Sequence, residues 1–416
     1  MTKLHRWCAT SAISFILSFG LSSLSACDGG VLVEPDAGSV GDDAGARADA
    51  GPGGTFDAGQ PDRWLDAAVV DGGGELPDAG GEARVGVLVG QGYAGRTLIS
   101  CDDGRTWHAD HVRDPTIARC FGGVVDCDHT PWTPKGIAYG EGGFAAVWGW
   151  GSDDGAMEWS DDGATWTHTG NQARPNFGGI ARAHEGFVAA RRTGSMSTPD
   201  GITWSDAGPL PNYAQVSLRY VGGADGLVFA YGDGNGMRDL MVSDDDGASW
   251  HRPTLPDPRC TSRIQNQGGV VGLGGVMVVA GGAGVACAST NGGQTWRATS
   301  MASDFSSTLA VRDGEAWIYS RGHAHHSADG VSWTTEETTP SDLDIGAIGV
   351  TASGTVVGGS GRRFDPTRWY DAQVMWRAED GVHFTPVPDD AIRGGHALRF
   401  FAYGEVVRPA ACDEAP

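Results

Sequence analysis

The sequence predicts an all-β fold in which one unit recurs seven times around a ring. Seven segments carry a glycine three positions before an aromatic residue, and two of them, 100–107 and 243–250, match the pattern Ser-x-Asp-x-Gly-x-Thr/Ser-Trp in full. Trp107 and Phe384, the first and last of these aromatic residues, are 277 positions apart over six intervals. The resulting period of about 46 residues is the size of one four-stranded blade, so we predict a seven-bladed β-propeller. The five degenerate copies end at Trp166, Trp204, Trp296, Trp333 and Phe384.

The residues of the repeated motif are those that a tight hairpin turn requires. Glycine adopts the left-handed backbone of such a turn without a steric penalty. The Ser and Asp side chains form hydrogen bonds with backbone groups that the turn leaves unpaired, and Trp begins the next strand and packs between sheets. Pro199 and Asn291 stand at the Asp position of two copies without interrupting the repeat. We therefore interpret the motif as structural and assign it no catalytic role.

Short apolar or alternating runs bounded by glycine separate the motifs, which is typical of strands. In the fourth repeat we predict an antiparallel blade of four strands, which from the inside outward are 216–221, 227–231, 240–243 and 248–252.

The two ends of the repeat region complement one another. Two strands, 85–89 and 97–100, precede the first motif, one fewer than the other blades have there, and an extra strand at 398–403 follows the last motif. The segment 401–405 (Phe-Ala-Tyr-Gly-Glu) resembles 137–141 (Ile-Ala-Tyr-Gly-Glu) in the inner strand of the second blade. We therefore expect the C-terminal strand to become the innermost strand of the first blade, which closes the ring and removes two open sheet edges.

Residues 1–26 are typical of an export signal that is removed. Lys3 and Arg6 precede an apolar stretch, 12–21, that is too short to span a bilayer as a permanent helix. The sequence Leu-Ser-Ala-Cys that ends at Cys27 resembles a bacterial lipobox, which implies that Cys27 is lipidated; an ordinary secretory signal is the alternative. No other apolar run approaches the ~20 residues of a spanning helix. We expect a protein of the cell envelope that contacts the membrane through its N-terminal lipid only. The sequence does not indicate which membrane leaflet holds the lipid.

Residues 27–83 have the composition of a disordered linker. The tripeptide Asp-Ala-Gly occurs five times, and the segment after Cys27 holds thirteen acidic residues against Arg47 and Arg63. Such a segment cannot bury enough apolar surface to offset its ordering entropy, so we expect a flexible tether. The net charge of the whole chain, −23, argues against nucleic acid or anionic lipid as a partner held by bulk electrostatics.

Residues 84–416 form the predicted propeller, and the motifs in 84–412 resemble the Asp-box (BNR) repeat of the sialidase-like superfamily. That superfamily includes sialidases, xyloglucan-active glycoside hydrolases, sortilin-type receptor heads and photosystem assembly factors. The resemblance implies the propeller fold and leaves the function open, because these relatives share turns and differ in their sites.

A sialidase-like site would imply three arginines that grip a substrate carboxylate, a tyrosine nucleophile with a glutamate partner, and an acid/base aspartate. The Arg-Ile-Pro signature of that site is absent from the sequence. Four arginines do lie on predicted inner strands, where they could equally bond to backbone inside the channel: Arg182, Arg219, Arg312 and Arg399. We therefore identify no catalytic residue. A binding or scaffold protein is the preferred interpretation, and an exo-acting, sialidase-like glycoside hydrolase is the alternative.

Two long connections, 108–134 and 361–371, are predicted to emerge on the face opposite the motifs and to flank the first blade. Both contain Arg and aromatic residues, the types that anchor interfaces and stack on sugars. The candidate binding residues are Arg113, Arg119, His129, Trp132, Arg362, Arg363, Arg368, Trp369 and Tyr370. We expect them to recognise a glycan or an envelope or extracellular protein; an ordinary surface loop is the alternative.

His323, His325 and His326 are adjacent, and the strand period places His323 and His325 on one side. Because no carboxylate or cysteine is fixed nearby in the sequence, we expect no metal there. Neither a phosphate-cradling loop nor a nucleophile elbow occurs, so we expect no cofactor. We also expect a monomer.

Export places the cysteines in an oxidising compartment, where disulfides persist. Six cysteines remain once the signal peptide and Cys27 are set aside, and topology selects among the 15 pairings that six cysteines allow. We predict three disulfides: Cys120–Cys127 within one long loop, Cys260–Cys287 within the fifth blade, and Cys101–Cys412 across the seam where the ring closes.

Overall fold

The computed structural model describes residues 83–414, with gaps at 114–131, 150–154, 173–176, 192–193, 211–216, 225, 235–236, 262–268, 282–283, 302–307, 344, 361–374 and 389–396. The predicted signal peptide, the lipidated Cys27 and the linker 27–83 lie outside the described residues, apart from Ala83.

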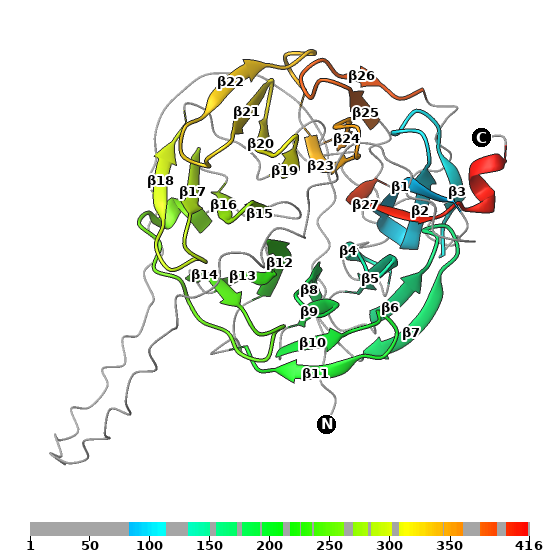
Figure 1. Ribbon diagram of the computed structural model, residues 1–416, viewed down its shortest axis with the longest axis horizontal. Coiled ribbons are helices and arrows are strands. Elements are labelled where there is room, and N and C mark those ends of the chain that lie inside the picture. The colour runs from blue at the N-terminus through cyan, green and yellow to red at the C-terminus, as the bar shows by residue number, and fades with distance from the viewer. Residues whose placement is uncertain are drawn as a thin grey trace, which may run out of the picture. The chain divides into compact units, whose positions relative to one another are not determined.

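The described strands form seven antiparallel sheets arranged as the blades of a propeller (Figure 1). From its innermost to its outermost strand, blade 1 contains β27 (Leu398–Val407), β1 (Arg84–Gly92), β2 (Arg96–Ser100) and β3 (His108–His111). In the same order, blade 2 contains β4 (Pro134–Gly140), β5 (Gly143–Trp148), β6 (Gly155–Ser160) and β7 (Thr167–Gln172). Blade 3 contains β8 (Phe177–Arg182), β9 (Phe187–Arg191), β10 (Gly194–Thr198) and β11 (Ser205–Gly208).

The remaining four blades follow the same inner-to-outer order. Blade 4 contains β12 (Ser217–Ala224), β13 (Leu227–Gly234) and β14 (Met237–Ser243). Blade 5 contains β15 (Val270–Leu273), β16 (Val276–Gly281), β17 (Val285–Ser289) and β18 (Arg297–Ser300). Blade 6 contains β19 (Thr308–Arg312), β20 (Glu315–Ser320), β21 (His323–Ser327) and β22 (Thr334–Glu337). Blade 7 contains β23 (Ile345–Val350), β24 (Val356–Ser360), β25 (Met375–Ala378) and β26 (Thr385–Pro386).

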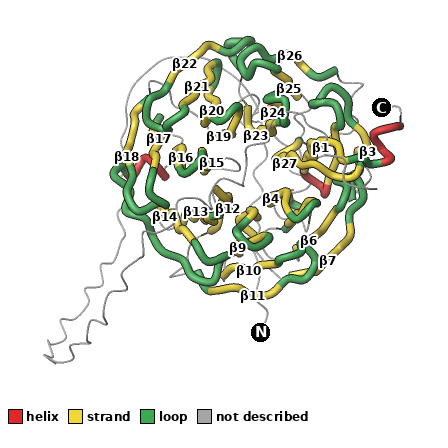
Figure 2. Tube along the Cα trace, viewed as in Figure 1, coloured by secondary structure: helices red, strands yellow, loops and turns green. Residues whose placement is uncertain are grey.

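Short 3-10 turns are the helical elements of the described chain, as Figure 2 shows against the predominance of strand and loop. They are η2 (Tyr93–Gly95), η4 (Pro258–Thr261) and η6 (Ala410–Asp413). Within the described ranges, no helix is long and apolar enough to cross a membrane.

The outer position of blade 4 differs from the prediction. Residues 248–252 form no regular strand; a single bridge joins Val242 and His251, each N–H donating to the other residue's carbonyl at 2.9 Å. Pro253 and Pro256 follow closely. Proline lacks the N–H that would extend the ladder, so pairing stops after one bridge.

The antiparallel order gives the ring two distinct faces. The turns between the first and second strands of a blade, and between the third and fourth, lie on one face, which we call the repeat-turn face. The turns between the second and third strands, and the connections from one blade to the next, lie on the other, which we call the loop face. The strand ends that flank the predicted binding connections therefore lie on the loop face, and the repeated motifs lie on the repeat-turn face.

Ring closure occurs as predicted. Strand β27 pairs antiparallel with β1 in a ladder that runs from Arg84 opposite Val407 to Gly92 opposite Leu398. The closing strand is longer than expected and extends to Val407. Among the described strands, the last one, β27, is thus the innermost strand of blade 1, and it pairs the edge of β1 that would otherwise be open.

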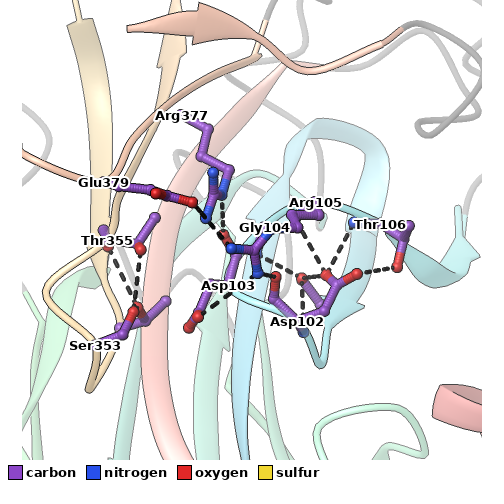
Figure 3. Close-up of polar contacts among 11 residues, drawn as sticks. Asp102, Asp103, Gly104, Arg105, Thr106, Ser353, Thr355, Arg377 and Glu379 are labelled. Carbon is purple, nitrogen blue, oxygen red and sulfur yellow. Dashed lines mark hydrogen bonds and ion pairs between the residues drawn. The ribbon is translucent and has the colours of Figure 1, made fainter. Parts of the chain in front are cut away.

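The repeated motif forms the hydrogen bonds that its residues predict. In blade 1, the Gly104 N–H donates to Ser100 Oγ at 2.8 Å, and the Thr106 N–H donates to Asp102 Oδ1 at 2.9 Å. The Thr106 hydroxyl donates to Asp102 Oδ2 at 2.7 Å (Figure 3). The side chains hold the turn closed, in agreement with a structural role.

One detail of the motif prediction is wrong. In blade 3, Asp200 rather than Pro199 acts as the acceptor, because the N–H groups of Ile202 and Thr203 donate to Asp200 Oδ1 at 2.9 and 2.7 Å. The turn has one residue fewer between Asp and Gly, which shifts the alignment by one position. Asn291 does take the Asp position and accepts from the Thr295 N–H at 2.9 Å. The same shorter turn occurs with Asp162, Asp329 and Asp380.

The hydrophobic core is divided among the seams between neighbouring blades. Between blades 1 and 2, Val87 packs with Phe144 and Trp148, and all three side chains are fully buried. Trp250 and Trp296, from the motifs of blades 4 and 5, are buried in two further seams. The motif tryptophans therefore pack between sheets, as their position in the repeat predicts.

Two of the three predicted disulfides are present. Cys101 is bonded to Cys412, with Cα atoms 5.9 Å apart, and Cys260 is bonded to Cys287, with Cα atoms 5.7 Å apart. The short helix η6 carries Cys412 beyond the closing strand. The predicted Cys120–Cys127 pair lies outside the described residues.

Candidate functional site

Of the nine predicted binding residues, the structure describes Arg113 and Trp132, near the two ends of the 108–134 connection. The other seven lie outside the described residues: Arg119, His129, Arg362, Arg363, Arg368, Trp369 and Tyr370. The described part of the site consists of Arg113, Trp132 and the side chains that contact them.

Arg113 and Trp132 lie against each other on the loop face. The Arg113 guanidinium carbon is 5.4 Å from the centre of the Trp132 ring, a cation–π arrangement. The Gly95 N–H donates to the Trp132 carbonyl at 3.1 Å, which ties the connection to the β1–β2 turn. Gly95 has a positive φ of 71°, and a Cβ there would lie 2.8 Å from the Cβ of Arg113. The two ends of the connection are thus fixed to blade 1.

Arg113 also reaches across the seam to a buried acid on blade 2. Its Nη2 atom is 2.9 Å from Glu158 Oε1; the Glu158 side chain is fully buried, and the Arg113 side chain is 21% exposed. The Trp148 indole N–H donates to Glu158 Oε2 at 3.0 Å. The Trp132 and Trp148 rings meet edge to face with centres 6.1 Å apart. We refer to Arg113, Trp132, Trp148 and Glu158 as the Arg113 cluster.

The burial of Glu158 determines its acid–base behaviour. Desolvation raises the pKa of this carboxyl from 4.5 to about 7, although the Arg113 charge and the Trp148 hydrogen bond both oppose the rise. Sequence reasoning missed Glu158. Its signal was an acidic residue between Met157 and Trp159 in a short strand of otherwise uncharged residues.

Two further polar contacts reinforce the loop face beside the Arg113 cluster. Gln91 is fully buried; its amide donates to the Val147 carbonyl at 3.2 Å and accepts from the Gly136 N–H at 3.2 Å. Arg96 binds both carboxylate oxygens of Asp110, at 2.9 and 2.7 Å. A bidentate pair of this kind holds β2 and β3 in fixed geometry next to Arg113.

The inner-strand arginines do not form one group. Arg182 and Arg312 lie at the repeat-turn ends of β8 and β19, whereas Arg399 lies at the loop-face end of β27. Arg312 donates to the carbonyls of Gly354 and Glu379 at 2.7 and 3.1 Å, which agrees with the backbone-bonding interpretation.

Arg182 pairs with Glu141 at 3.0 Å, and Arg399 lies 5.8 Å from the ring centre of Tyr93. Arg219 lies on β12, and its side chain is outside the described part of the structure.

On the repeat-turn face, a polar network joins blade 7 to blade 1 (Figure 3). Glu379 binds Arg105 at 2.9 Å and Arg377 at 2.8 Å. Arg377 Nε also donates to the Asp103 carbonyl at 2.7 Å. This network links the first repeat turn to blade 7, close to the seam that the Cys101–Cys412 disulfide closes.

The histidines on β21 are held by protein partners. The rings of His323 and His325 stack with centres 6.3 Å apart, which confirms that they share one side of the strand. Burial lowers the pKa of His325 to about 4. His326 lies between carboxylates of the flanking strands, 2.7 Å from Glu315 and 3.0 Å from Glu336. In the described part of the chain, no group of three or more His, Cys, Asp or Glu side chains is arranged to hold a metal.

No protein-family model and no curated protein matches the sequence. The similar solved structures are propellers of varied function. A streptogramin B lyase is 11% identical with a TM-score of 0.45, covering 61% of this chain and 82% of that chain. YCF48 bound to D1 peptide is 11% identical with a TM-score of 0.43, covering 66% of this chain and 93% of that chain. The GH74 enzyme of Niastella koreensis is 14% identical with a TM-score of 0.37, covering 78% of this chain and 66% of that chain. At this identity the likeness concerns the fold alone.

Proposed function

We propose that this chain is a lipid-anchored binding or scaffold protein of the cell envelope, a propeller of the Asp-box superfamily that recognises a glycan or a protein through its loop face. The superfamily assignment is supported by the Ser and Asp hydrogen bonds of the repeat turns. The lipid anchor rests on the lipobox-like sequence that ends at Cys27.

The observation that carries the choice of face is where the chain enters the ring. Strand β1 begins at Arg84, which is opposite Val407 at the repeat-turn end of the closing strand. The segment that precedes Arg84 therefore joins the propeller on the repeat-turn face. An anchor at Cys27 would therefore connect to the ring at the repeat-turn end of blade 1.

The scaffold under the predicted binding connections is also well fixed. The Cys101–Cys412 bond, the Glu379 network and the long β27–β1 ladder all hold the seam at blade 1. Loops on such a rigid support are where binding commonly resides.

The test is a glycan array and a pull-down from envelope extracts, each performed with the full mature chain and with the triple variant Arg368→Ala, Trp369→Ala and Tyr370→Ala. Binding should be lost in the triple variant while the melting temperature stays within a few degrees of the parent. Unfolding of the triple variant would instead place these residues in the core and refute the site.

A panel of chromogenic glycosides tests the alternative function, a glycoside hydrolase. Turnover of a glycoside that disappears in an Arg399→Ala variant would favour the hydrolase.

The anchor has its own test, because Cys27→Ala removes the thiol that the proposal requires to be lipidated. The variant should move from the membrane fraction to the soluble fraction. A variant that remains with the membrane would refute the lipid anchor without affecting the proposed binding face.

A further inference from the structure

We propose that Arg113 and Glu158 form a proton-coupled anion site on the loop face, which takes the carboxylate of an acidic glycan and binds it more tightly as Glu158 gains a proton. This inference deepens the proposed function, since it rests on the loop face being the binding face and adds a ligand class and a means of regulation.

Arg113 and Glu158 are incompletely paired. The Arg113 guanidinium meets Glu158 through Nη2 alone, and its buried Nε atom forms no hydrogen bond. Glu158 Oε1 is likewise buried and, apart from the ion-pair contact, has no hydrogen-bond donor. A guanidinium carries five N–H donors in a planar fork that matches a carboxylate in bidentate geometry. Arg113 thus forms fewer hydrogen bonds with Glu158 than its five N–H donors allow, and its side chain is 21% exposed whereas that of Glu158 is fully buried.

Few ionisable side chains surround Glu158 on the strands that pack against it. The strand β5 contributes no ionisable side chain, and on β7 the residue opposite Glu158 is His168. Lys135 lies at the start of β4, and the Arg96–Asp110 pair neutralises itself within blade 1. Arg113 is the charge that acts on the Glu158 carboxyl. The positive charge of Arg113 is therefore neutralised within the Arg113 cluster only when Glu158 is ionised.

Anion binding at Arg113 and protonation of Glu158 are therefore thermodynamically linked. When Glu158 is ionised, it neutralises Arg113 and opposes the approach of a second anion. When Glu158 is protonated, Arg113 carries an uncompensated charge beside the Trp132 ring, and a ligand carboxylate takes the place of the lost partner. Reciprocity requires that a bound carboxylate raise the pKa of Glu158 by the same coupling free energy. Burial already places that pKa near 7, so the change occurs within an ordinary environmental pH range.

The experiment uses the full mature chain and trigalacturonate, an oligosaccharide of three uronic acids, as the probe. Calorimetric titration at pH 5.5 and pH 8.5 should show affinity that is about tenfold higher at the lower pH, a typical coupling between linked sites. The variant Glu158→Gln should bind with equal affinity at both pH values. Arg113→Met should lose binding, and Arg113→Lys should retain part of it. Arg408→Met, which alters an exposed arginine that pairs with Asp413 just beyond the closing strand, should bind as the parent does.

The contradicting results are specific. Equal affinity of the parent at the two pH values, unchanged binding by Arg113→Met, or no binding of trigalacturonate at either pH would each overturn the proton-coupled site. The proposed function is separate: it survives such a failure if the array or pull-down still depends on Arg368, Trp369 and Tyr370. If both experiments fail, the loop face is not the binding face.

Discussion

Cys101 and Cys412 are joined by a disulfide although 311 positions of sequence separate them. Cys101 lies in the first repeat turn, and Cys412 follows the strand that closes the ring. The bond therefore fixes the two ends of the propeller to each other outside the β27–β1 ladder. A propeller opens most readily at such a seam, because one strand supplied from the other end of the chain completes the first blade.

Removing this bond should lower the free energy of unfolding. The chain-entropy treatment gives about 6 kcal/mol for a loop this long, slightly above the roughly 2–5 kcal/mol found when native disulfides are removed from small domains. We expect the variant Cys101→Ala/Cys412→Ala to unfold at a clearly lower guanidinium concentration than the parent. The matched control is Cys260→Ala/Cys287→Ala, which opens a loop of only 27 positions and should cost less. An equal loss of unfolding free energy in the two double variants would show that the length of the loop closed at the seam does not determine the stabilisation.

The short repeat turns make the protein sensitive to strong acid. Backbone N–H groups that donate to Asp200 and Asp329 hold the pKa of each carboxyl at about 2, below its ordinary value of 3.8. Their contribution to stability is present above about pH 4 and is lost as the pH falls through about 2. The variant Asp329→Asn keeps an acceptor oxygen, as Asn291 does naturally, so its stability should depend less on pH between 4 and 2. Urea unfolding at pH 2, 3 and 5 measures this, and identical pH slopes for parent and variant would contradict it.

Glu158 should have the opposite effect. Its folded-state pKa of about 7 lies above the ordinary value of 4.5, so the folded protein holds a proton that the unfolded chain releases between these values. Stability from this group is therefore full below about pH 4.5 and declines as the pH rises through about 7. Glu158→Gln should flatten this decline in urea unfolding. Glu379→Gln is the control, because hydrogen bonds from Arg377 and Arg105 lower the pKa of Glu379 and confine its effect to acid pH.

Alanine substitutions at two glycines distinguish the cost of backbone strain from the cost of a steric clash. Gly201 and Gly292 both have positive φ, 73° and 65°. A Cβ at Gly292 meets nothing within 4 Å, whereas a Cβ at Gly201 would overlap the Trp159 ring. Gly292→Ala should cost about 1–2 kcal/mol from the left-handed backbone alone. Gly201→Ala should cost about 2 kcal/mol more because a buried ring must move. Thermal unfolding of the two variants decides this, and equal melting temperatures would refute the packing argument.

The fold could be predicted because each propeller blade repeats a local signal. The turn motif, its period and the resemblance between 401–405 and 137–141 all lie within short stretches of chain. The errors arose where one residue changes the local chemistry: a shortened turn moved the acceptor from Pro199 to Asp200, and the prolines after His251 ended pairing in blade 4.

The site was less accessible to sequence reasoning. Residue type correctly drew attention to Arg113 and Trp132, but the acid that pairs with Arg113 lies on another blade. Only the packing of blade 1 against blade 2 brings Glu158 to it and raises the pKa of that carboxyl. The Arg113 cluster is therefore a product of tertiary structure that no local pattern encodes.

The central claim, that partners bind the loop face, can be tested by site-specific photo-crosslinking in intact envelopes. A benzophenone amino acid would replace Arg321, an exposed residue on the loop face, or Ile202, which is 51% exposed on the repeat-turn face. We predict a crosslinked product from the Arg321 site and none above background from the Ile202 site. A product from the Ile202 site alone would contradict the account.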